Sequence, residues 1–207
     1  AQLKYLQAQI NPHFLFNTLN AGAQLAMMEG ADRTYDYIQN VADFFRYNVK
    51  KGNDIVTLRE ELELIDHYIY ILNVRFSGDI HYEKEISDDL LDCAVPSMIL
   101  QPIVENAVIH GIKENVPLTI RLKAWVGKEM LYISIIDDGK GFDQEKAGED
   151  GVPKSSKMSG IGLHNVKDRL YLAYKDNQSF SINSVQGQGT EVQMTMPYTE
   201  WKEESDV

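Results

Sequence analysis

Hydrophobic residues near the start of the chain repeat with helical periodicity. Over residues 1 to about 29 they fall on about one quarter of the helical circumference, taken at roughly 100° per residue. This first stripe consists of Leu3, Leu6, Ile10, Phe14, Ala21 and Met28. Gly30 ends the first helix, and a second stripe consists of Ile38, Val41, Ala42, Phe45 and Val49. The polar run at 51–54 interrupts this second helix, so the pattern predicts a helical hairpin over residues 1–53.

A third helix is predicted to begin at Thr57, because Glu60 three residues later completes a capping box. Its apolar positions follow the spacing 4-3-4-3-4, which is typical of a seam in a helix bundle. These positions are Leu58, Leu62, Ile65, Ile69, Leu72 and Phe76. The spacing alone leaves open whether this helix joins the bundle or the domain that follows.

After Ser77 the chain changes to a mixture of strands and helices. Helices are predicted at about 96–110 and 160–175. Strands are predicted at about 80–86, 118–126, 130–137, 179–184 and 190–196. Some strands are linked by hairpins, such as the one at Gly127 and Lys128, so the predicted fold class is α+β. We expect a helical hairpin followed by an α/β sandwich rather than a doubly wound sheet.

The net charge and the cysteine content of the chain exclude some classes of function. The formal net charge of -11 excludes a protein that binds nucleic-acid backbones, which needs a basic surface. The single cysteine, Cys93, excludes an intrachain disulfide and indicates a reducing compartment. No apolar stretch reaches the length of a membrane span. Because the chain opens inside an apparent helix without Met, we expect a cytoplasmic piece of a longer protein, with any membrane segments upstream.

The apolar strand at 131–136 ends in Asp137, which is followed by Gly139 and Gly141. A carboxylate at this place can accept a hydrogen bond from the exocyclic amine of adenine, a donor that guanine lacks there. The glycines let the backbone turn sharply beside the ring. The alternative for this motif alone is an ordinary Asp-Gly hairpin turn.

Asn106 and His110 lie four residues apart and so share one face of the helix predicted at 96–110. A neutral amide oxygen suits Mg²⁺, which keeps several waters and bridges nucleotide phosphates. His110 has a donor for a phosphate oxygen. The alternative is that both residues satisfy the end of a core helix.

A third motif, Gly160 to Leu163, is predicted to open a helix. Glycines at Gly160 and Gly162 would expose N–H groups to phosphate oxygens. The motif is not a dinucleotide-binding fingerprint, because Asn165 replaces its last glycine and no strand precedes it. A fourth motif, Gly187 to Thr190, is by itself a hairpin turn.

The order and spacing of these four motifs resemble the GHKL (Bergerat-type) ATP-binding domain. The element from Gln9 to Asn17 resembles the phosphoacceptor helix of sensor histidine kinases. Over residues 1–197 the chain is most similar to the LytS/YesM-like group of two-component kinases. The resemblance implies ATP and Mg²⁺ as cofactors, with Asn106 as the metal ligand. It further implies nucleotide contacts from His110, Asp137, Gly139, Gly141, Gly160, Gly162, Leu163, Gly189 and Thr190.

The resemblance also implies an ATP-binding domain over 54–200, which includes the third helix, and a frayed acidic tail over 201–207. Hydrolases of this fold carry a general-base Glu four residues before the Asn, where this chain has Pro102. That difference favours phosphoryl transfer, with His13 as the acceptor. Asn17 and Glu105 complete the candidate catalytic group as residues that could orient His13. The commoner kinases place an acidic residue after the acceptor, and here that residue is Phe14.

A histidine kinase of this kind is expected to be a homodimer that passes its phosphoryl group to an aspartate of a response regulator. Its parent protein is expected to be anchored in a bacterial cell membrane. The alternatives are an ATP hydrolase or clamp of the same fold, a serine kinase of the anti-sigma type, and a scaffold with a vestigial pocket. The signal, the regulator and the choice between cis and trans transfer stay open. Residues 143–159 are expected to form a lid that orders when nucleotide binds.

Overall fold

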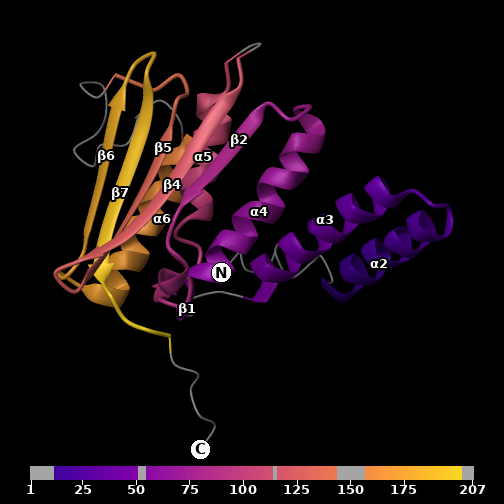
Figure 1. The fold of residues 1–207 in the computed structure, drawn as a ribbon, viewed down its shortest axis with the longest axis horizontal. Coiled ribbons are helices and arrows are strands. Elements are labelled where there is room, and N and C mark those ends of the chain that lie inside the picture. Colours follow the sequence, from indigo (N-terminus) through magenta and orange to yellow (C-terminus); the bar gives the residue numbers. More distant parts are fainter. Residues whose placement is uncertain (1–11, 51–54, 114–115, 144–156, 202–207) are drawn as a thin grey trace, which may run out of the picture.

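A helical hairpin at the N-terminus is followed by a sheet packed against helices (Figure 1). The computed structural model describes residues 12–50, 55–113, 116–143 and 157–201. The helices are α2 (Pro12–Met28), α3 (Asp32–Lys50), α4 (Leu58–Arg75), α5 (Gln101–Gly111) and α6 (Lys157–Tyr174), with a short 3₁₀ helix η1 (Asp88–Leu90). The strands are β1 (Ile55–Thr57), β2 (Ile80–Glu85), β3 (Ala94–Pro96), β4 (Leu118–Gly127), β5 (Met130–Asp137), β6 (Ser179–Val185) and β7 (Gly189–Pro197).

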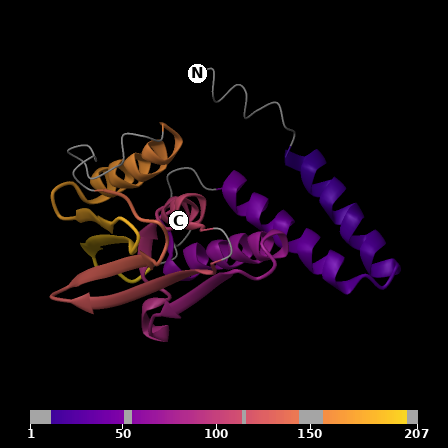
Figure 2. The ribbon, with the colours of Figure 1, turned by 90° about the horizontal axis from the view of Figure 1, so that it is seen from above.

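The main sheet has five strands in the order β2-β4-β5-β7-β6. β2 runs parallel to β4, while the pairs β4–β5, β5–β7 and β7–β6 are antiparallel. Every second side chain is buried from Leu118 to Ala124 on β4 and from Leu131 to Asp137 on β5, where Ser134 is buried as well, in keeping with the period of two in a strand. Figure 2 shows that α4, α5 and α6 lie on one side of this sheet, while α2 and α3 project away from it. The predicted α+β architecture is therefore confirmed.

α4 begins at the predicted capping box. The Glu60 N–H donates to Thr57 Oγ1 at 3.2 Å, and the Thr57 N–H donates to Glu60 Oε2 at 3.0 Å. The apolar seam of α4 is buried in the same core as the sheet, through Leu58, Leu62, Ile65 and Ile69. The seam thus packs against the sheet domain, while α3 packs against another part of α4.

The hairpin of α2 and α3 forms as predicted, but α2 packs through a different face. Ala23, Ala26 and Ala42 are buried where the two helices meet. The described part of the predicted stripe faces solvent, with Phe14 70% and Met28 83% exposed. Small alanines let the two helix backbones approach closely, and the larger apolar side chains stay on the outside.

Two predicted boundaries are wrong. The helix expected from about 96 begins at Gln101, because residues 94–96 form β3 and pair with β1. The helix expected from about 160 begins at Lys157. Most of the predicted lid, at 144–156, and the tail at 202–207 lie outside the described residues. Within the described residues, no helix is both long enough and apolar enough to cross a membrane.

Candidate functional site

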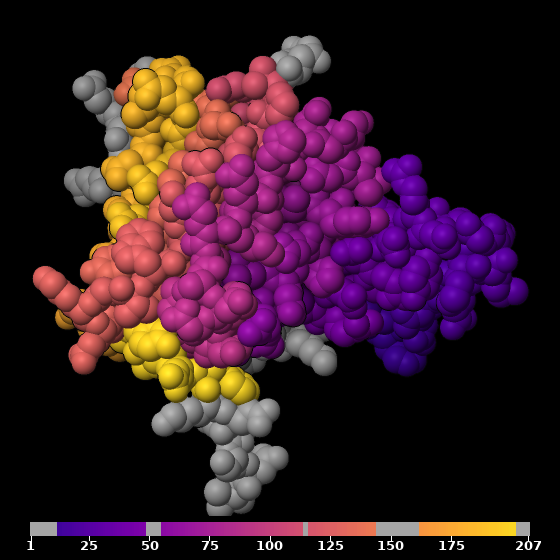
Figure 3. Space-filling view, viewed as in Figure 1, coloured from indigo at the N-terminus to yellow at the C-terminus, as the bar shows by residue number. Residues whose placement is uncertain are grey.

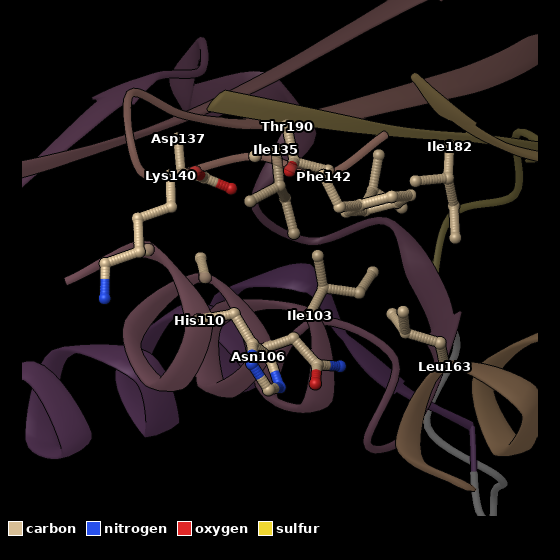
Figure 4. Close-up of a pocket in the computed structure, with 14 residues that line it drawn as sticks. Ile103, Asn106, His110, Ile135, Asp137, Lys140, Phe142, Leu163, Ile182 and Thr190 are labelled. Atoms are coloured by element: carbon tan, nitrogen blue, oxygen red, sulfur yellow. The ribbon is translucent and has the colours of Figure 1, made fainter. Parts of the chain in front are cut away.

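A cavity of about 240 Å³ lies between α5, α6 and the ends of β5, β6 and β7. Its walls are mostly apolar, formed by Ile103, Ala107, Ile135, Phe142, Leu163, Ile182 and Val192. Polar groups come from Asn106, His110, Asp137, Lys140 and Thr190 (Figure 4). Pockets that hold a whole drug-sized ligand usually measure about 300–1,000 Å³. This cavity is therefore smaller than a pocket that encloses a whole ligand of that size, so part of such a ligand would extend beyond it.

Asp137, the last residue of β5, is only 9% exposed beside this cavity. Its Oδ1 accepts a hydrogen bond from the Gly139 N–H at 2.9 Å. Burial raises the pKa of this carboxyl group to about 6, against the opposing effect of hydrogen bonds from Gly139 and Thr190. The neighbouring Asp138 is exposed instead, and its Oδ1 accepts from the Thr119 N–H at 2.7 Å. The strand end thus directs one carboxyl group to the cavity and the other to β4.

We expect the affinity for an adenine nucleotide to fall as the pH is lowered through about 6. A protonated Asp137 is a weaker acceptor for the exocyclic amine, so the loss reaches up to about tenfold per pH unit. Stability changes in the opposite direction. Because the pKa is raised on folding, the contribution of Asp137 to stability is fully present below its unfolded value and is lost as the pH rises through about 6.

Calorimetric titrations from about pH 5 to 8 measure this pH dependence. The matched control is Asp137→Asn, which keeps the titration of the nucleotide phosphates and of His110. The difference between the two profiles isolates the Asp137 carboxyl group. Parallel profiles would contradict a direct contact between Asp137 and the base.

α5 presents Asn106 and His110 on one face, as their spacing predicted (Figure 4). The Asn106 amide donates through Nδ2 to the Pro102 carbonyl at 2.9 Å, which leaves Oδ1 as its acceptor for a ligand. Burial, assisted by the charge of Lys140, lowers the pKa of His110 and favours its neutral form. The described residues contain no group of three or more His, Cys, Asp or Glu side chains able to hold a metal. One amide oxygen fits Mg²⁺, which takes its other ligands from phosphates and water.

Three glycines let the loops around the cavity approach each other. A Cβ at Gly139 would lie closer than 3.0 Å to the backbone of Gly111, and one at Gly141 would meet the Val185 carbonyl in the same way. Gly189 has φ +122°, and its Cβ would collide with the Asp137 carbonyl. Backbone therefore contacts backbone at each place, and any side chain would move the loops apart.

Sequence reasoning missed Ser184, which ties the two sides of the cavity together. Its buried Oγ accepts from the Phe142 N–H at 2.9 Å and donates to the Gly189 carbonyl at 3.1 Å. The Thr190 hydroxyl oxygen also lies 2.9 Å from Ser184 Oγ. A serine in a strand carries no motif, so only its three-dimensional partners identify this role. Gly111 and Lys140 also line the cavity without having been predicted, although Lys140 lies within the motif from Asp137 to Gly141.

The third glycine motif lies inside α6 rather than at its first residues. The helix begins at Lys157, so only Gly160 is among the first four residues, whose N–H groups lack partners within a helix. Gly162 faces α5, where a Cβ would contact the Pro102 Cβ at 3.5 Å and lie 3.8 Å from Asn106 Nδ2. Leu163 is buried and lines the cavity. Arg169, further along α6, donates through Nη1 to the Ser97 carbonyl at 3.0 Å.

The remaining predicted residues lie outside the cavity. Glu105 accepts a hydrogen bond from Gln101 Nε2 at 2.6 Å and is not among the lining residues. His13 is exposed on α2, and Asn17 Nδ2 lies 3.3 Å from its Nδ1. Figure 1 shows α3 and α4 between α2 and the helices that border the cavity. Within this one copy, the structure does not bring His13 and Asn17 to the cavity.

Two protein-family models match the chain. Residues 1–80 match a model described as "Histidine kinase". Residues 95–200 match one described as "Histidine kinase-, DNA gyrase B-, and HSP90-like ATPase". The second match covers half of the chain and contains every residue that lines the cavity.

Several bacterial proteins are similar over nearly the whole chain. The sensor histidine kinase YesM of Bacillus subtilis is 32% identical over 95% of this chain and 33% of its own length. The sensor protein LytS of Bacillus cereus is 29% identical over 100% of this chain and 36% of its own. The sensor histidine kinase BtsS of Escherichia coli is 29% identical over 99% of this chain and 34% of its own. The chain thus spans about a third of the length of these relatives.

Solved structures share the fold at lower identity. The histidine kinase domain of the blue-light activated histidine kinase EL346 from Erythrobacter litoralis superposes with a TM-score of 0.53 and 15% identity. That match covers 89% of this chain and 95% of the other. The mycobacterial sensor histidine kinase MprB gives a TM-score of 0.53 and 17% identity, over 72% of this chain and 100% of the other.

Proposed function

The chain belongs to the histidine kinase-, DNA gyrase B- and HSP90-like ATPase family, and on that basis we propose that its cavity binds ATP with Mg²⁺ and that His13 receives the γ-phosphoryl group. The observation that carries the proposal is the buried carboxyl group of Asp137 in an apolar cavity that also holds Asn106 and His110. The same cavity therefore offers an acceptor for a base and polar groups for phosphates. The cavity volume of about 240 Å³ agrees with a base inside and phosphates outside.

Each side chain has a proposed task. Asp137 accepts a hydrogen bond from the adenine amine, and the apolar walls enclose the ring. Asn106 Oδ1 is the ligand for Mg²⁺, which supplies charge neutralisation for the phosphates when it is bound. His110 and the Gly160 N–H donate to phosphate oxygens. Gly139, Gly141, Gly162, Gly189, Leu163 and Thr190 shape the cavity.

The transfer step uses His13 as the nucleophile. A neutral ring nitrogen attacks the γ-phosphorus, the bond from this phosphorus to the bridging oxygen breaks, and ADP leaves. The nitrogen–phosphorus bond replaces it, and the ring proton passes to solvent. Asn17, one turn along α2, is placed to orient the ring. Pro102 occupies the position at which hydrolases of this fold carry a base, which favours transfer over hydrolysis.

We propose a homodimer built on the α2–α3 hairpin, which projects from the rest of the molecule (Figure 3). The outer face of α2 exposes the large apolar side chains of Phe14, Leu25 and Met28. Exposed apolar patches of this kind mark interaction surfaces, and two hairpins together make a four-helix bundle. Because α3 and α4 separate His13 from the cavity of its own chain, transfer needs a second copy or a rearrangement of the hairpin.

The parent protein is proposed to be a two-component sensor kinase. YesM, LytS and BtsS are named as sensor proteins, and each is similar to this chain over the residues that match the two family models. In such a system the phosphoryl group passes from His13 to an aspartate of a response regulator. Membrane anchoring would come from segments outside this chain.

Incubation with γ-labelled ATP and Mg²⁺ tests the proposal. We expect one label per chain that is released by acid and stable in base, as a phosphoramidate bond requires. A label stable in acid would point to a serine kinase instead. Rapid phosphate release without protein label would identify a hydrolase, and failure to bind nucleotide would leave a scaffold.

A further inference from the structure

The turn that precedes α5 is held by one buried carboxylate from α4. Glu61 is 0% exposed, and its Oε1 accepts from the Met98 N–H at 2.7 Å. Its Oε2 accepts from the N–H groups of Ile99 and Leu100, both at 3.0 Å. The hydrogen bonds oppose the cost of removing the charge from water, because burial raises the pKa of this carboxyl group and each donor lowers it.

The same turn is strained and is also held from its other side. Met98 has φ +60°, a left-handed conformation that side chains with a Cβ rarely adopt. Arg169 of α6 donates to the Ser97 carbonyl at 3.0 Å. The Glu61 carboxylate accepts from the N–H groups of this turn, and the Arg169 guanidinium donates to the carbonyl that precedes them. Together they hold a backbone conformation that would relax without them. α5, with Asn106 on its second turn, begins directly after this turn.

A tyrosine from the helical hairpin reaches the same carboxylate. The Tyr47 hydroxyl of α3 donates to Glu61 Oε1 at 3.1 Å. The burial of Tyr47 and the charge of Glu61 raise the pKa of this hydroxyl group, so it stays a donor. Two further contacts join α3 to α4 nearby: Asn40 Oδ1 lies 2.8 Å from His67 Nδ1, and the rings of Phe44 and Tyr68 stack with centroids 5.7 Å apart.

We infer that Glu61 is a positioning residue for phosphoryl transfer, which links the orientation of the hairpin, through Tyr47, to the turn that sets α5 and its Asn106. The inference rests on the proposed function of α5 and His13. A shift of α3 relative to α4 changes the donors on Glu61 and so changes the support of the turn. Because coupling between sites is reciprocal, nucleotide bound at α5 must in turn alter α3.

Tyr47→Phe removes the hydroxyl donor but keeps the ring and the backbone bonds to Glu61. We expect kcat for labelling of His13 to fall roughly tenfold, as expected for loss of a hydrogen bond to a charged group, and KM for ATP to change by a few fold only, because the nucleotide loses its coupling to α3. Glu61→Gln places an amide against four donors, so it should raise KM as well as lower kcat.

The matched control is Tyr35→Phe, on the same helix as Tyr47, and it should keep both values. A purely structural role would instead lower the melting temperature and leave kcat of the folded protein unchanged.

Hydrogen exchange tests the link without using phosphoryl transfer. In the unmodified chain, a non-hydrolysable ATP analogue with Mg²⁺ should slow exchange in residues 40–48 of α3. The response should persist in Tyr35→Phe and vanish in Tyr47→Phe. A response that survives Tyr47→Phe, or one absent from the unmodified chain despite binding of the analogue, would overturn the inference. If the analogue binds but His13 is never labelled, the proposed function fails, and the exchange result still decides the inference.

Discussion

Replacement of His13 by alanine is expected to reduce the protein label from γ-labelled ATP to background. Alanine has no nucleophile, and no other group in the proposed step can form the nitrogen–phosphorus bond. Loss of the whole chemical step corresponds to at least about a thousandfold decrease in labelling rate. ATP affinity should be unchanged, because His13 lies on α2 and does not line the cavity.

His81→Ala is the matched control for this experiment. His81 lies on β2, is exposed and is not among the residues that line the cavity. We expect this variant to be labelled at the rate of the unmodified chain. Full labelling of His13→Ala would remove His13 from the mechanism, whatever happens to His81→Ala.

Gly189→Ala is expected to have the largest effect on nucleotide binding. Its φ of +122° is unfavourable for alanine, and the added Cβ would collide with the Asp137 carbonyl. β7 must then move away from the end of β5, where the register pairs Asp137 with Thr190. Strain of roughly 1–3 kcal/mol, together with displacement of Asp137, predicts at least a tenfold loss of ATP affinity and a lower melting temperature.

Gly187→Ala separates the two causes of this loss. Gly187 has φ +84° in the same loop, but a Cβ there would have nothing within 4 Å. This variant carries the conformational cost without the collision and should bind ATP within a few fold of the unmodified chain. Equal losses in the two variants would mean that the backbone conformation, rather than contact with Asp137, determines affinity.

Sequence patterns formed by residues close together in the chain predicted much of this fold. The capping box at Thr57 and Glu60 and the buried seam of α4 were both correct, because helix geometry fixes which residues meet. The matches to residues 1–80 and 95–200 confirm the resemblance to sensor histidine kinases. Asp137, Asn106 and Thr190, predicted from separate motifs, line one cavity.

Features that depend on long-range packing could not be predicted in this way. β1 and β3 have three residues each, too few for a period to be visible, and pairing with each other creates them. The apolar stripe of α2 predicted a helix but not which face α3 would cover. Phe142, which donates to Ser184, and the turn that donates to Glu61 are distant from them in sequence, so neither residue stands out in the chain itself. The roles of the individual site residues stay predictions for the experiments above.

The contact between Gly111 and Gly139 limits which sequences can diverge from this one. A Cβ at Gly139 would meet the Gly111 backbone, and a Cβ at Gly111 would meet the Leu118 side chain and approach the Gly139 Cα. Neither residue has a side chain that could be shortened to make room for the other. A second substitution at one of these positions therefore cannot compensate for a substitution at the other. We expect both positions to stay glycine together. A smaller side chain at Leu118 could make room for a change at Gly111, whereas a change at Gly139 meets the Gly111 backbone, which no substitution can shorten.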